Sequence, residues 1–277
     1  MKWRTVFWGS SPISVPFVRY IHTEHELVGV VTRPDKPAGR GHRIQPTPVS
    51  AAVPDTIPVL KPRILSDKSF VSSLQTIDHD FGLIVAYGKI IPEHMLSLPR
   101  RGLLNVHFSL LPKYRGPAPI QHALLNGEKQ TGVSIFKIEK DIDTGPLYAQ
   151  QSVAIDQKQD DYHTLADKLI RVGIELLNKI LHQFKQGTIT EYPQSGASSY
   201  APLITKQDAV INWHKPARII RNTIAALVDW PTAQTRHQDG RVIKILKAEC
   251  TDSSNQASPA TPGQVISIVK NKGFIVQ

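Results

Sequence analysis

Two polar side chains within one apolar run are the residues of this chain best placed to do chemistry. Asn105 and His107 lie one residue apart in GLLNVHFS, residues 102–109, a run whose composition predicts a β-strand. Because side chains alternate along a strand, the amide and the imidazole should share one face while Val106 points into the core. In a parallel sheet the carboxyl end of such a strand opens onto the crevice in which ligands bind. The spacing therefore predicts a polar pair that faces a substrate, although two structural residues at a strand end would show the same spacing.

An irregular segment follows this strand and adds candidate binding groups. Residues 109–120 read SLLPKYRGPAPI, in which Pro112 lacks the N–H donor that a central strand needs. The chain must turn there, and one glycine and two further prolines keep it irregular until a helix begins near Ile120. Asp143 precedes Thr-Gly-Pro, which is a turn signal, so this carboxylate should also lie on a loop. Loops at a ligand crevice commonly carry the binding groups.

The elements that must position these residues follow an alternating pattern. Strands separated by helices predict βαβ units and a mainly parallel, Rossmann-like α/β sheet. The clearest helix covers residues 161–185, where the apolar side chains form a single stripe. The predicted strands are residues 4–10, 26–32, 81–87, 102–109, 132–139 and 147–155.

The remainder of the chain has a different pattern. A polar tract at residues 190–205 reads as a linker between a larger domain, residues 1–189, and a smaller one, residues 206–277. After a helix near 215–228, four short strand candidates are separated by glycine-containing turns, at residues 232–237, 241–250, 263–269 and 273–277. Hairpin-like spacing of this kind predicts a small antiparallel β-barrel, OB-like in type.

Composition limits the classes of function. Cys250 is the only cysteine of the 277 residues, which excludes internal disulfides and a site of several thiolates and makes a reducing, intracellular location the default. No apolar run approaches the ~20 residues that span a bilayer. The net charge of +10 makes a polyanionic partner plausible, and residues 206–277 carry ten Lys and Arg against five Asp and Glu. Neither a Walker A loop nor a G-x-G-x-x-G motif is present, so we expect no dinucleotide cofactor.

The combination of these segments resembles one enzyme family. Residues 105–146, NVHFSLLPKYRGPAPIQHALLNGEKQTGVSIFKIEKDIDTGP, are similar to the core of the 10-formyltetrahydrofolate-dependent formyltransferases, and AYGKIIP, residues 86–92, resembles a loop that lines their folate pocket. The resemblance implies that residues 1–189 form the catalytic domain. It implies catalytic roles for Asn105, His107 and Asp143, and contact of Ser109, Leu110, Leu111 and Pro112 with the folate.

The implied reaction suits these residue types. Transfer of a formyl group from the folate to an amine passes through a tetrahedral intermediate that bears an oxyanion. Asn105 and a protonated His107 can donate hydrogen bonds to that oxygen, and one such donor is typically worth about 2.7–4 kcal/mol of barrier. Asp143 can hold His107 oriented or charged and relay protons between the two nitrogens. The reaction requires no metal and no covalent nucleophile, so we expect 10-formyltetrahydrofolate as the donor cosubstrate and no metal.

The loop after the second predicted strand suggests which amine is the acceptor. RPDKPAGRGHRIQPTPV, residues 33–49, resembles an insertion typical of the family members that act on methionyl-tRNA, and Arg40 matches the loop arginine that they use for tRNA. The loop has a net charge of +3, although a solvated surface loop could carry the same charge. We therefore expect initiator methionyl-tRNA as the partner of a monomeric enzyme in the cytoplasm or an organellar matrix. A nucleotide-amino-sugar N-formyltransferase and a non-catalytic RNA-binding protein are the alternatives.

The C-terminal segment is similar to the same family. Residues 206–235 resemble the entry into its C-terminal OB-like, tRNA-binding domain. Arg218 and Arg221 lie one turn apart on the predicted helix and could face a phosphate backbone or simply solvent. Family members usually continue through further barrel strands beyond the GFIVQ that ends this chain, so the resemblance implies a truncated sequence, a shortened barrel or a reduced affinity for tRNA.

Overall fold

The computed structural model describes residues 2–38, 43–251, 260–271 and 273–277. The chain forms two compact units, and the boundary between them is not a single point of the sequence. Two short segments from the first 165 residues belong to the same unit as the C-terminal part. The first unit comprises Met1–Pro119, Thr131–Ala154 and Ala166–Pro202, and the second comprises Ile120–Gln130, Ile155–Leu165 and Leu203–Gln277.

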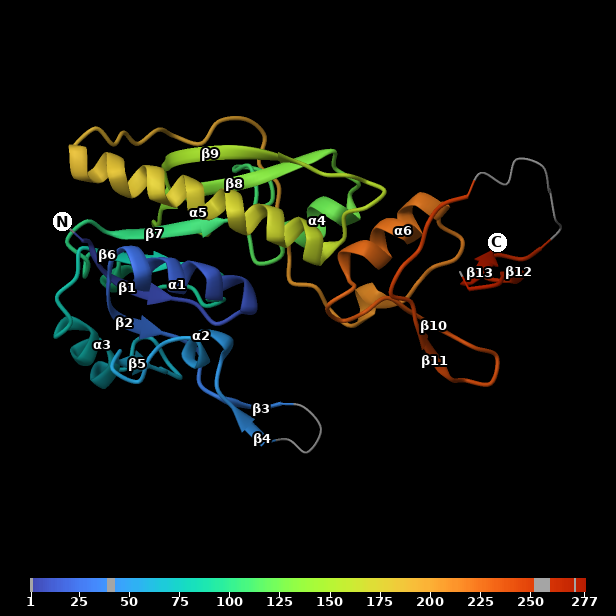
Figure 1. Cartoon of the computed structure of the whole chain (residues 1–277), viewed down its shortest axis with the longest axis horizontal. Coiled ribbons are helices and arrows are strands. Elements are labelled where there is room, and N and C mark those ends of the chain that lie inside the picture. The colour runs from blue at the N-terminus through green and yellow to red at the C-terminus, as the bar shows by residue number, and fades with distance from the viewer. Residues whose placement is uncertain (1, 39–42, 252–259, 272) are drawn as a thin grey trace. The chain divides into compact units, whose positions relative to one another are not determined.

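A seven-stranded sheet in the order β5-β2-β1-β6-β7-β8-β9 is the framework of the first unit (Figure 1). The first five strands in this order pair in parallel, whereas β8 runs antiparallel to β7. The strands are β1 (Arg4–Trp8), β2 (Glu26–Val31), β5 (Val59–Leu60), β6 (Phe81–Ile84), β7 (Leu103–His107), β8 (Gln130–Lys137) and β9 (Leu147–Ala154). The mainly parallel α/β sheet predicted from the sequence is confirmed. Because the strand order reverses between β1 and β6, the carboxyl ends of these strands form the usual ligand crevice of such folds.

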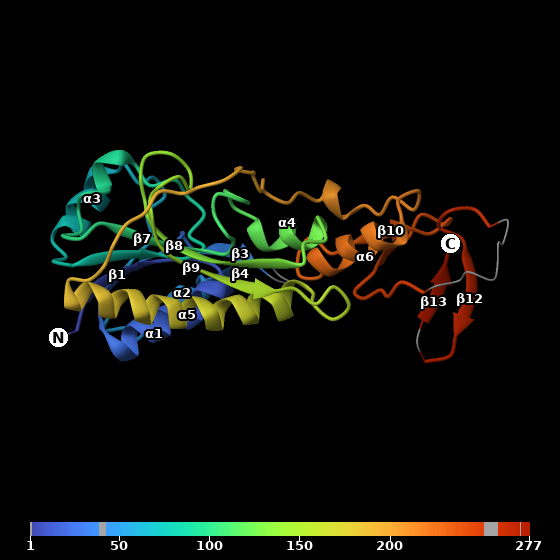
Figure 2. The ribbon, with the colours of Figure 1, turned by 90° about the horizontal axis from the view of Figure 1, so that it is seen from above.

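Helices cover both faces of this sheet. Figure 2 shows α1 (Val15–Glu24) and the long α5 (Tyr162–Gln186) on one side and α3 (Lys68–Gln75) on the other. The packing of α1 on α5 is close, because a Cβ atom at Gly173 would lie 2.9 Å from the ring of Phe17. The Tyr20 hydroxyl also donates to Asn178 Oδ1 at 3.0 Å. Among the described residues, 3₁₀ turns occur at Pro12–Ser14, Glu93–Met95 and Gln207–Ala209.

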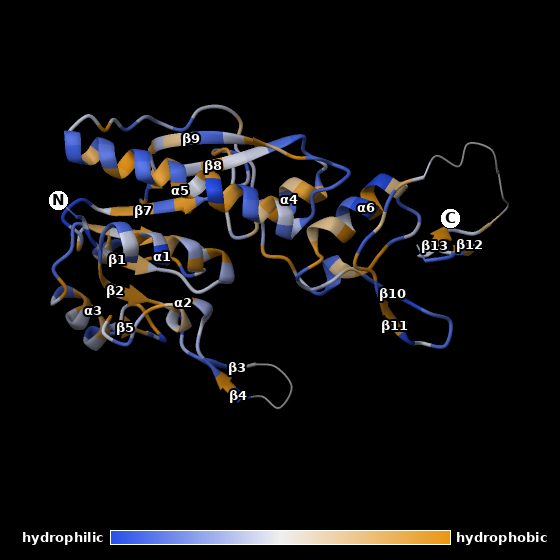
Figure 3. Cartoon of the chain, in the orientation of Figure 1, coloured by the Kyte–Doolittle hydropathy of each residue, from blue (hydrophilic) through white to orange (hydrophobic). Residues whose placement is uncertain are grey.

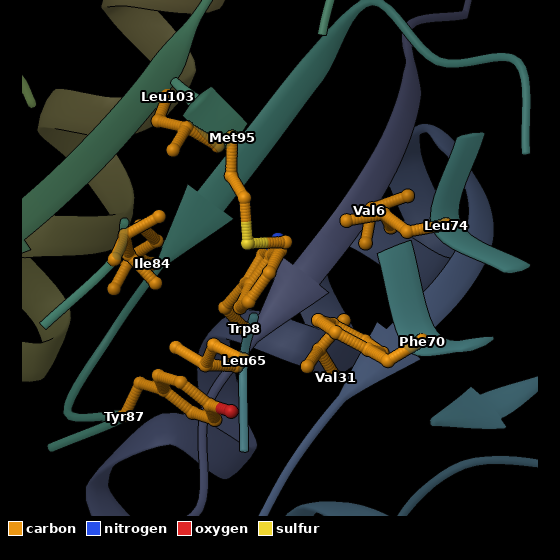
Figure 4. Close-up of a cluster of buried hydrophobic side chains, with 11 residues drawn as sticks. Val6, Trp8, Val31, Leu65, Phe70, Leu74, Ile84, Tyr87, Met95 and Leu103 are labelled. Carbon is orange, nitrogen blue, oxygen red and sulfur yellow. The ribbon is translucent and has the colours of Figure 1, made fainter. Parts of the chain in front are cut away.

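Alternation along the strands supplies the buried core on the α3 side. Val6 and Trp8 of β1 point to the same face and pack with Phe70 and Leu74 of α3, as Figure 4 shows. The indole of Trp8 meets the rings of Phe70 and Tyr87 edge to face. In Figure 3 the central strands are correspondingly among the most apolar parts of the chain. This core fixes the strand ends that carry the functional loops.

The basic loop after β2 is more regular than the sequence predicts. It contains a short hairpin of β3 (Lys36–Ala38) and β4 (Arg43–Gln45), followed by the helix α2 (Pro48–Ala51), whose first turn is capped by Thr47. A two-stranded ribbon leaves one edge of each strand unpaired, so Pro37 can take part in it although it lacks an N–H donor.

The second unit contains short helices, among them the helix predicted near residues 215–228, and antiparallel hairpins. Its elements are α4 (Pro119–Leu125), whose first residue is still assigned to the first unit, α6 (Ala217–Ala226), β10 (Gln234–Arg236), β11 (Val242–Lys244), β12 (Val265–Val269) and β13 (Gly273–Val276). Within the described residues β10–β11 and β12–β13 are two separate antiparallel pairs, so a closed OB-like barrel is not confirmed. Ile211, Ile224 and Ala233 form a small buried cluster. None of the helices built from described residues is long and apolar enough to cross a bilayer.

Candidate active site

The two polar residues of β7 share one face of the sheet, as strand alternation predicts. In the register of β7 with β8, Asn105 lies opposite Phe136 and His107 opposite Ser134. Val106 points to the other face, because a Cβ atom at Gly173 of α5 would lie 3.5 Å from its side chain. The amide and the imidazole are therefore held by the ladder of a central strand, on the side opposite α5.

Asp143 reaches this pair from the loop between β8 and β9. Its Oδ1 lies 3.5 Å from Asn105 Nδ2, and its Oδ2 lies 3.7 Å from His107 Nδ1 and accepts a hydrogen bond of 2.7 Å from the Gly116 N–H. The backbone of Asp143 is left-handed, with φ of +53°, which is rare for a residue with a side chain. The structure thus brings together the three residues for which the sequence resemblance implies catalysis, with one of them in a strained conformation of the kind that clusters at functional sites.

The partner of Nε2 determines which ring nitrogen of His107 carries a proton. Nε2 lies 2.8 Å from the Tyr114 carbonyl oxygen, which can only accept, so Nε2 is the nitrogen that carries a proton. Nδ1 is the nitrogen that faces the carboxylate of Asp143. The side chains of His107 and Asp143 are only 7% and 13% exposed. A charge that forms between them is therefore poorly screened by water.

Hydrogen bonds within residues 109–113 and with β8 and β9 hold the segment that is predicted to contact folate. The hydroxyl of Ser109 donates to the Lys113 carbonyl, and the buried hydroxyl of Ser134 donates to the Ser109 carbonyl and accepts from the Leu111 N–H. Gln150 of β9 donates to the Leu111 carbonyl at 2.8 Å. Leu111 and Pro112 are buried, whereas Leu110 is partly exposed. Contact of these four residues with a folate stays a prediction.

The loop after β6 is fixed from two sides. The guanidinium of Arg33 donates to the carbonyls of Tyr87 and Gly88 at 3.0 and 2.6 Å. The ammonium of Lys89 donates to the Pro62 and Arg63 carbonyls. Burial raises the pKa of the Tyr87 hydroxyl to about 12, so this hydroxyl stays protonated at physiological pH. Ala86 and Gly88 both have positive φ, which turns the backbone sharply at the carboxyl end of β6.

Residues 192–201, which we call the strap, lie within the tract that the sequence predicts to be a linker. Tyr192 and Leu147 exchange two backbone hydrogen bonds, and Arg115 does the same with Ser199 and Ala201. The side chain of Gln194 bonds to the loop that carries Asp143 and to Arg115. Sequence reasoning missed this role, because a Ser- and Gly-rich composition is also that of a free linker. The sequence signal that was available is the tyrosine-alanine pair at the end of this polar tract. In the structure Ala201 is fully buried and the ring of Tyr200 lies over Gly116.

Comparison with known proteins places this geometry in a family. Residues 16–181 match the formyl transferase model, and residues 203–277 match the model of the formyl transferase C-terminal domain. The methionyl-tRNA formyltransferase of Thermodesulfovibrio yellowstonii is 40% identical over 94% of this chain and 83% of its own length. The chain belongs to the methionyl-tRNA formyltransferase family. Another member, from Sulfurihydrogenibium, is 39% identical over 99% of this chain and 88% of its own length.

Solved structures share the fold of this family member at lower identity. An N-formyltransferase of Helicobacter canadensis, solved with folinic acid and dTDP-3-aminofucose, superposes with a TM-score of 0.67 at 21% identity and covers 97% of this chain and 91% of its own. HypX of Aquifex aeolicus, solved with tetrahydrofolic acid, gives 0.69 at 15% identity and covers 97% of this chain. The chain spans 41% of HypX. At these identities the likeness establishes the fold alone.

The charged residues of the loop after β2 divide into two groups. Arg33 is used internally on the loop after β6, and Asp35 pairs with Lys61 at 2.8 Å. Lys36 and Arg43 of the hairpin are exposed. Arg40, which we predict to contact tRNA, lies outside the described residues.

The two arginines predicted on α6 differ in their surroundings. Arg218 is exposed. Arg221 is buried and donates to the Asn222 side chain and to the Asp160 carbonyl, all within the second unit. The proposed phosphate-facing or solvated role is therefore wrong for Arg221, because its guanidinium is already used inside the unit. Within the described part of the chain, no group of three His, Cys, Asp or Glu side chains is arranged to hold a metal ion.

Proposed function

We propose that this protein transfers the formyl group of 10-formyltetrahydrofolate to the amino group of initiator methionyl-tRNA, the step that prepares this tRNA for translation initiation. One observation carries the proposal. Asn105, His107 and Asp143 converge at the carboxyl end of β7 in a chain about 40% identical to methionyl-tRNA formyltransferases. A protein that only bound RNA would have no use for this convergence.

In the proposed reaction Asn105 and His107 stabilise charge on the formyl oxygen. Attack of the amine on the formyl carbon moves negative charge onto that oxygen. The Nδ2 of Asn105 and a protonated Nδ1 of His107 are two donors held on one face of β7. Because both are fixed before the reaction begins, each can lower the barrier without reorganisation, typically by about 2.7–4 kcal/mol.

Asp143 is proposed to handle the protons. The bond from the formyl carbon to the amine forms first and gives the tetrahedral intermediate, and the bond to the folate nitrogen breaks when this intermediate collapses. The attacking nitrogen therefore loses one proton and the leaving nitrogen gains one. Oδ2 accepts a short hydrogen bond from the Gly116 N–H, whereas the contact of Oδ1 with Asn105 Nδ2 is long at 3.5 Å, so we assign the uptake and return of that proton to Oδ1. The same carboxylate stabilises a protonated His107 across the 3.7 Å between them.

The binding roles carried over from the family remain part of the proposal. We propose that Ser109, Leu110, Leu111 and Pro112 contact the folate, with Leu110 the most accessible side chain of the four. We further propose a catalytic domain of residues 1–189, a linker of 190–205 and an OB-like tRNA-binding domain of 206–277. The hairpin pairs β10–β11 and β12–β13 support the last assignment as far as they extend. A monomer acting in the cytoplasm or an organellar matrix completes the proposal.

Formyl incorporation into two acceptors tests the function. The protein is supplied with 10-formyltetrahydrofolate and either charged initiator tRNA or a nucleotide amino sugar. We expect transfer to the tRNA and little to the sugar. Transfer to the sugar alone would make the protein a nucleotide-sugar N-formyltransferase, and transfer to neither would leave an RNA-binding role without catalysis.

The contribution of Arg40 is tested separately. We expect Arg40→Ala to raise the KM for tRNA while the affinity for the folate donor is unchanged, since a lost phosphate contact weakens only tRNA binding. Arg19→Ala, which removes an exposed arginine of α1, is the matched control for the loss of one positive charge. Equal effects of the two substitutions on KM would contradict a specific role for Arg40.

A further inference from the structure

We propose that Gln194 is a positioning residue for formyl transfer, which holds the carboxylate of Asp143 in its reactive place. The inference rests on the function proposed above. Both the nitrogen and the oxygen of the Gln194 side-chain amide form hydrogen bonds. Nε2 donates to the carbonyls of Asp143 and Gly145 at 2.8 and 2.9 Å, and Oε1 accepts from Nη2 and Nε of Arg115 at 2.7 and 3.2 Å. One side chain thereby joins the loop after β7 to the loop after β8.

The loop that carries Asp143 needs such an external support. Its backbone leaves the regular ladder after Lys137, and Asp143 has the left-handed φ of +53°. Gly145 passes so close to β8 that a Cβ atom there would overlap the Lys137 carbonyl. A strained residue keeps its conformation only where its surroundings determine it. The two hydrogen bonds from Gln194 fix the carbonyls on either side of Thr144, and so they fix the direction in which Asp143 points.

Gln194 also completes a closed ring of contacts around the carboxylate. The Oδ2 of Asp143 accepts from the N–H of Gly116, the residue that follows Arg115. Arg115 donates to Gln194, and Gln194 donates to the Asp143 carbonyl. The loop after β7 therefore holds the side chain of Asp143, and Gln194 of the strap, which is tied to that loop through Arg115, holds its backbone. Loss of the amide would leave the side-chain bond in place and release the backbone.

The strap can perform this task because it is itself fixed. Tyr192 pairs with Leu147 through two backbone hydrogen bonds, two residues before Gln194. On the other side, the Ser199 hydroxyl accepts from the Tyr114 N–H, and the Ser199 N–H donates to the Pro112 carbonyl. With both flanks anchored, the amide is held in place with little further cost in conformational freedom.

Three variants test the inference in the full chain. Gln194→Ala removes both halves of the amide. Gln194→Glu keeps an acceptor for Arg115 and loses the donor to Asp143 and Gly145. Gln151→Ala is the matched control, since Gln151 is an exposed glutamine of β9 whose amide reaches only the Ser152 carbonyl, at 3.5 Å.

The expected result is a loss in kcat with little change in binding. Both Gln194 variants should lose about 10- to 100-fold in kcat, because a displacement of ~1 Å at a reacting group can cost about 10²-fold. The KM for tRNA, the affinity for the folate donor and Tm should stay close to those of Gln151→Ala. Adding Gln194→Ala to Asp143→Ala should cost less than threefold further, since Gln194 acts through Asp143.

Three outcomes would overturn the inference. They are a near-normal kcat of Gln194→Glu, a loss of turnover matched by an equal loss of folate affinity or folded protein, and a full additional loss in the Asp143→Ala background. Failure of the proposed function is distinguishable from all three, because the unsubstituted protein would then transfer no formyl group to tRNA.

Discussion

The end of β7 and the C-terminal hairpins differ in how their polar groups are held. At β7 each functional side chain has partners from other segments, as Asp143 has in Gly116 and Gln194 has in Arg115. In the C-terminal hairpins the contacts are local, such as those that Asp239 makes with His237 and Arg241 between β10 and β11. Large apolar side chains are exposed there as well, including Ile268 at 73% and Phe274 at 68%.

This contrast matches two different physical tasks. A developing charge of one unit must be met by donors placed within a fraction of an ångström, which requires rigid partners. A long polyanion is attracted by exposed cations whose individual positions matter less. If the proposed roles are correct, substitutions at the end of β7 should damage turnover, whereas substitutions in the C-terminal hairpins should not.

The largest effect is expected at the residues that we propose to be catalytic. Asn105→Ala and Asp143→Ala should each lower kcat about 100- to 1000-fold, as removal of one preorganised donor typically does. Steady-state kinetics with charged tRNA provide the measurement, and Tm should change little. A near-full rate in either variant would contradict the role assigned to that residue.

The next largest effect is expected when a buried and an exposed leucine are each replaced by alanine. Leu74 of α3 is 1% exposed and Leu246 is 63% exposed. Leu74→Ala should lower the free energy of unfolding by about 2–5 kcal/mol, because it leaves a cavity. Leu246→Ala should change it by no more than about 0.5 kcal/mol. Denaturant titration measures both, and equal losses would show that the surroundings of Leu246 are as well packed as the core.

The pair of arginines on α6 sharpens the comparison within the second unit. Arg221→Met should destabilise the fold by about 1.5–3 kcal/mol, the usual worth of hydrogen bonds from a charged donor. Arg218→Met should leave stability unchanged and, if this exposed arginine meets a phosphate, make tRNA binding less sensitive to salt. Thermal melts and salt titrations of tRNA binding distinguish the two effects. A salt effect at Arg221 without destabilisation would contradict its buried role.

The smallest effect concerns pH and His79, which precedes β6. Burial lowers the pKa of this imidazole, and its Nε2 is buried without a hydrogen-bond partner. A folded-state pKa below the unfolded value means that the neutral form is favoured on folding. Its contribution to stability is thus complete above the unfolded pKa of about 6.5 and is lost as the pH falls below it.

Substitution of His79 checks this sign. In His79→Asn the amide nitrogen can replace Nδ1 as donor to the Ile77 carbonyl, so the drop in Tm between pH 7.5 and pH 5 should become smaller than in the unsubstituted protein. His182→Asn, at an exposed position of α5, is the control. An unchanged pH dependence of Tm in His79→Asn would contradict the assignment.

The sequence predicted the sheet well because alternating and continuous apolar runs report directly on burial. The common face of Asn105 and His107 followed from the two-residue period of a strand. The site around Asp143 was accessible only through family resemblance, since spacing alone does not bring residues 38 positions apart into contact. The strap escaped prediction for a different reason. It is held chiefly by backbone hydrogen bonds, which any residue type except proline can make.

The interleaved division of the chain has a consequence for protein engineering. The Gly127 carbonyl is bound by Gln157, and the Asp160 carbonyl by Arg221, so residues from three stretches of sequence complete one unit. A gene cut at the strap would release a C-terminal fragment without residues 120–130 and 155–165, which belong to the same unit. The C-terminal part cannot be exchanged between relatives as an independent cassette, and a functional chimaera must carry all three stretches from the same parent.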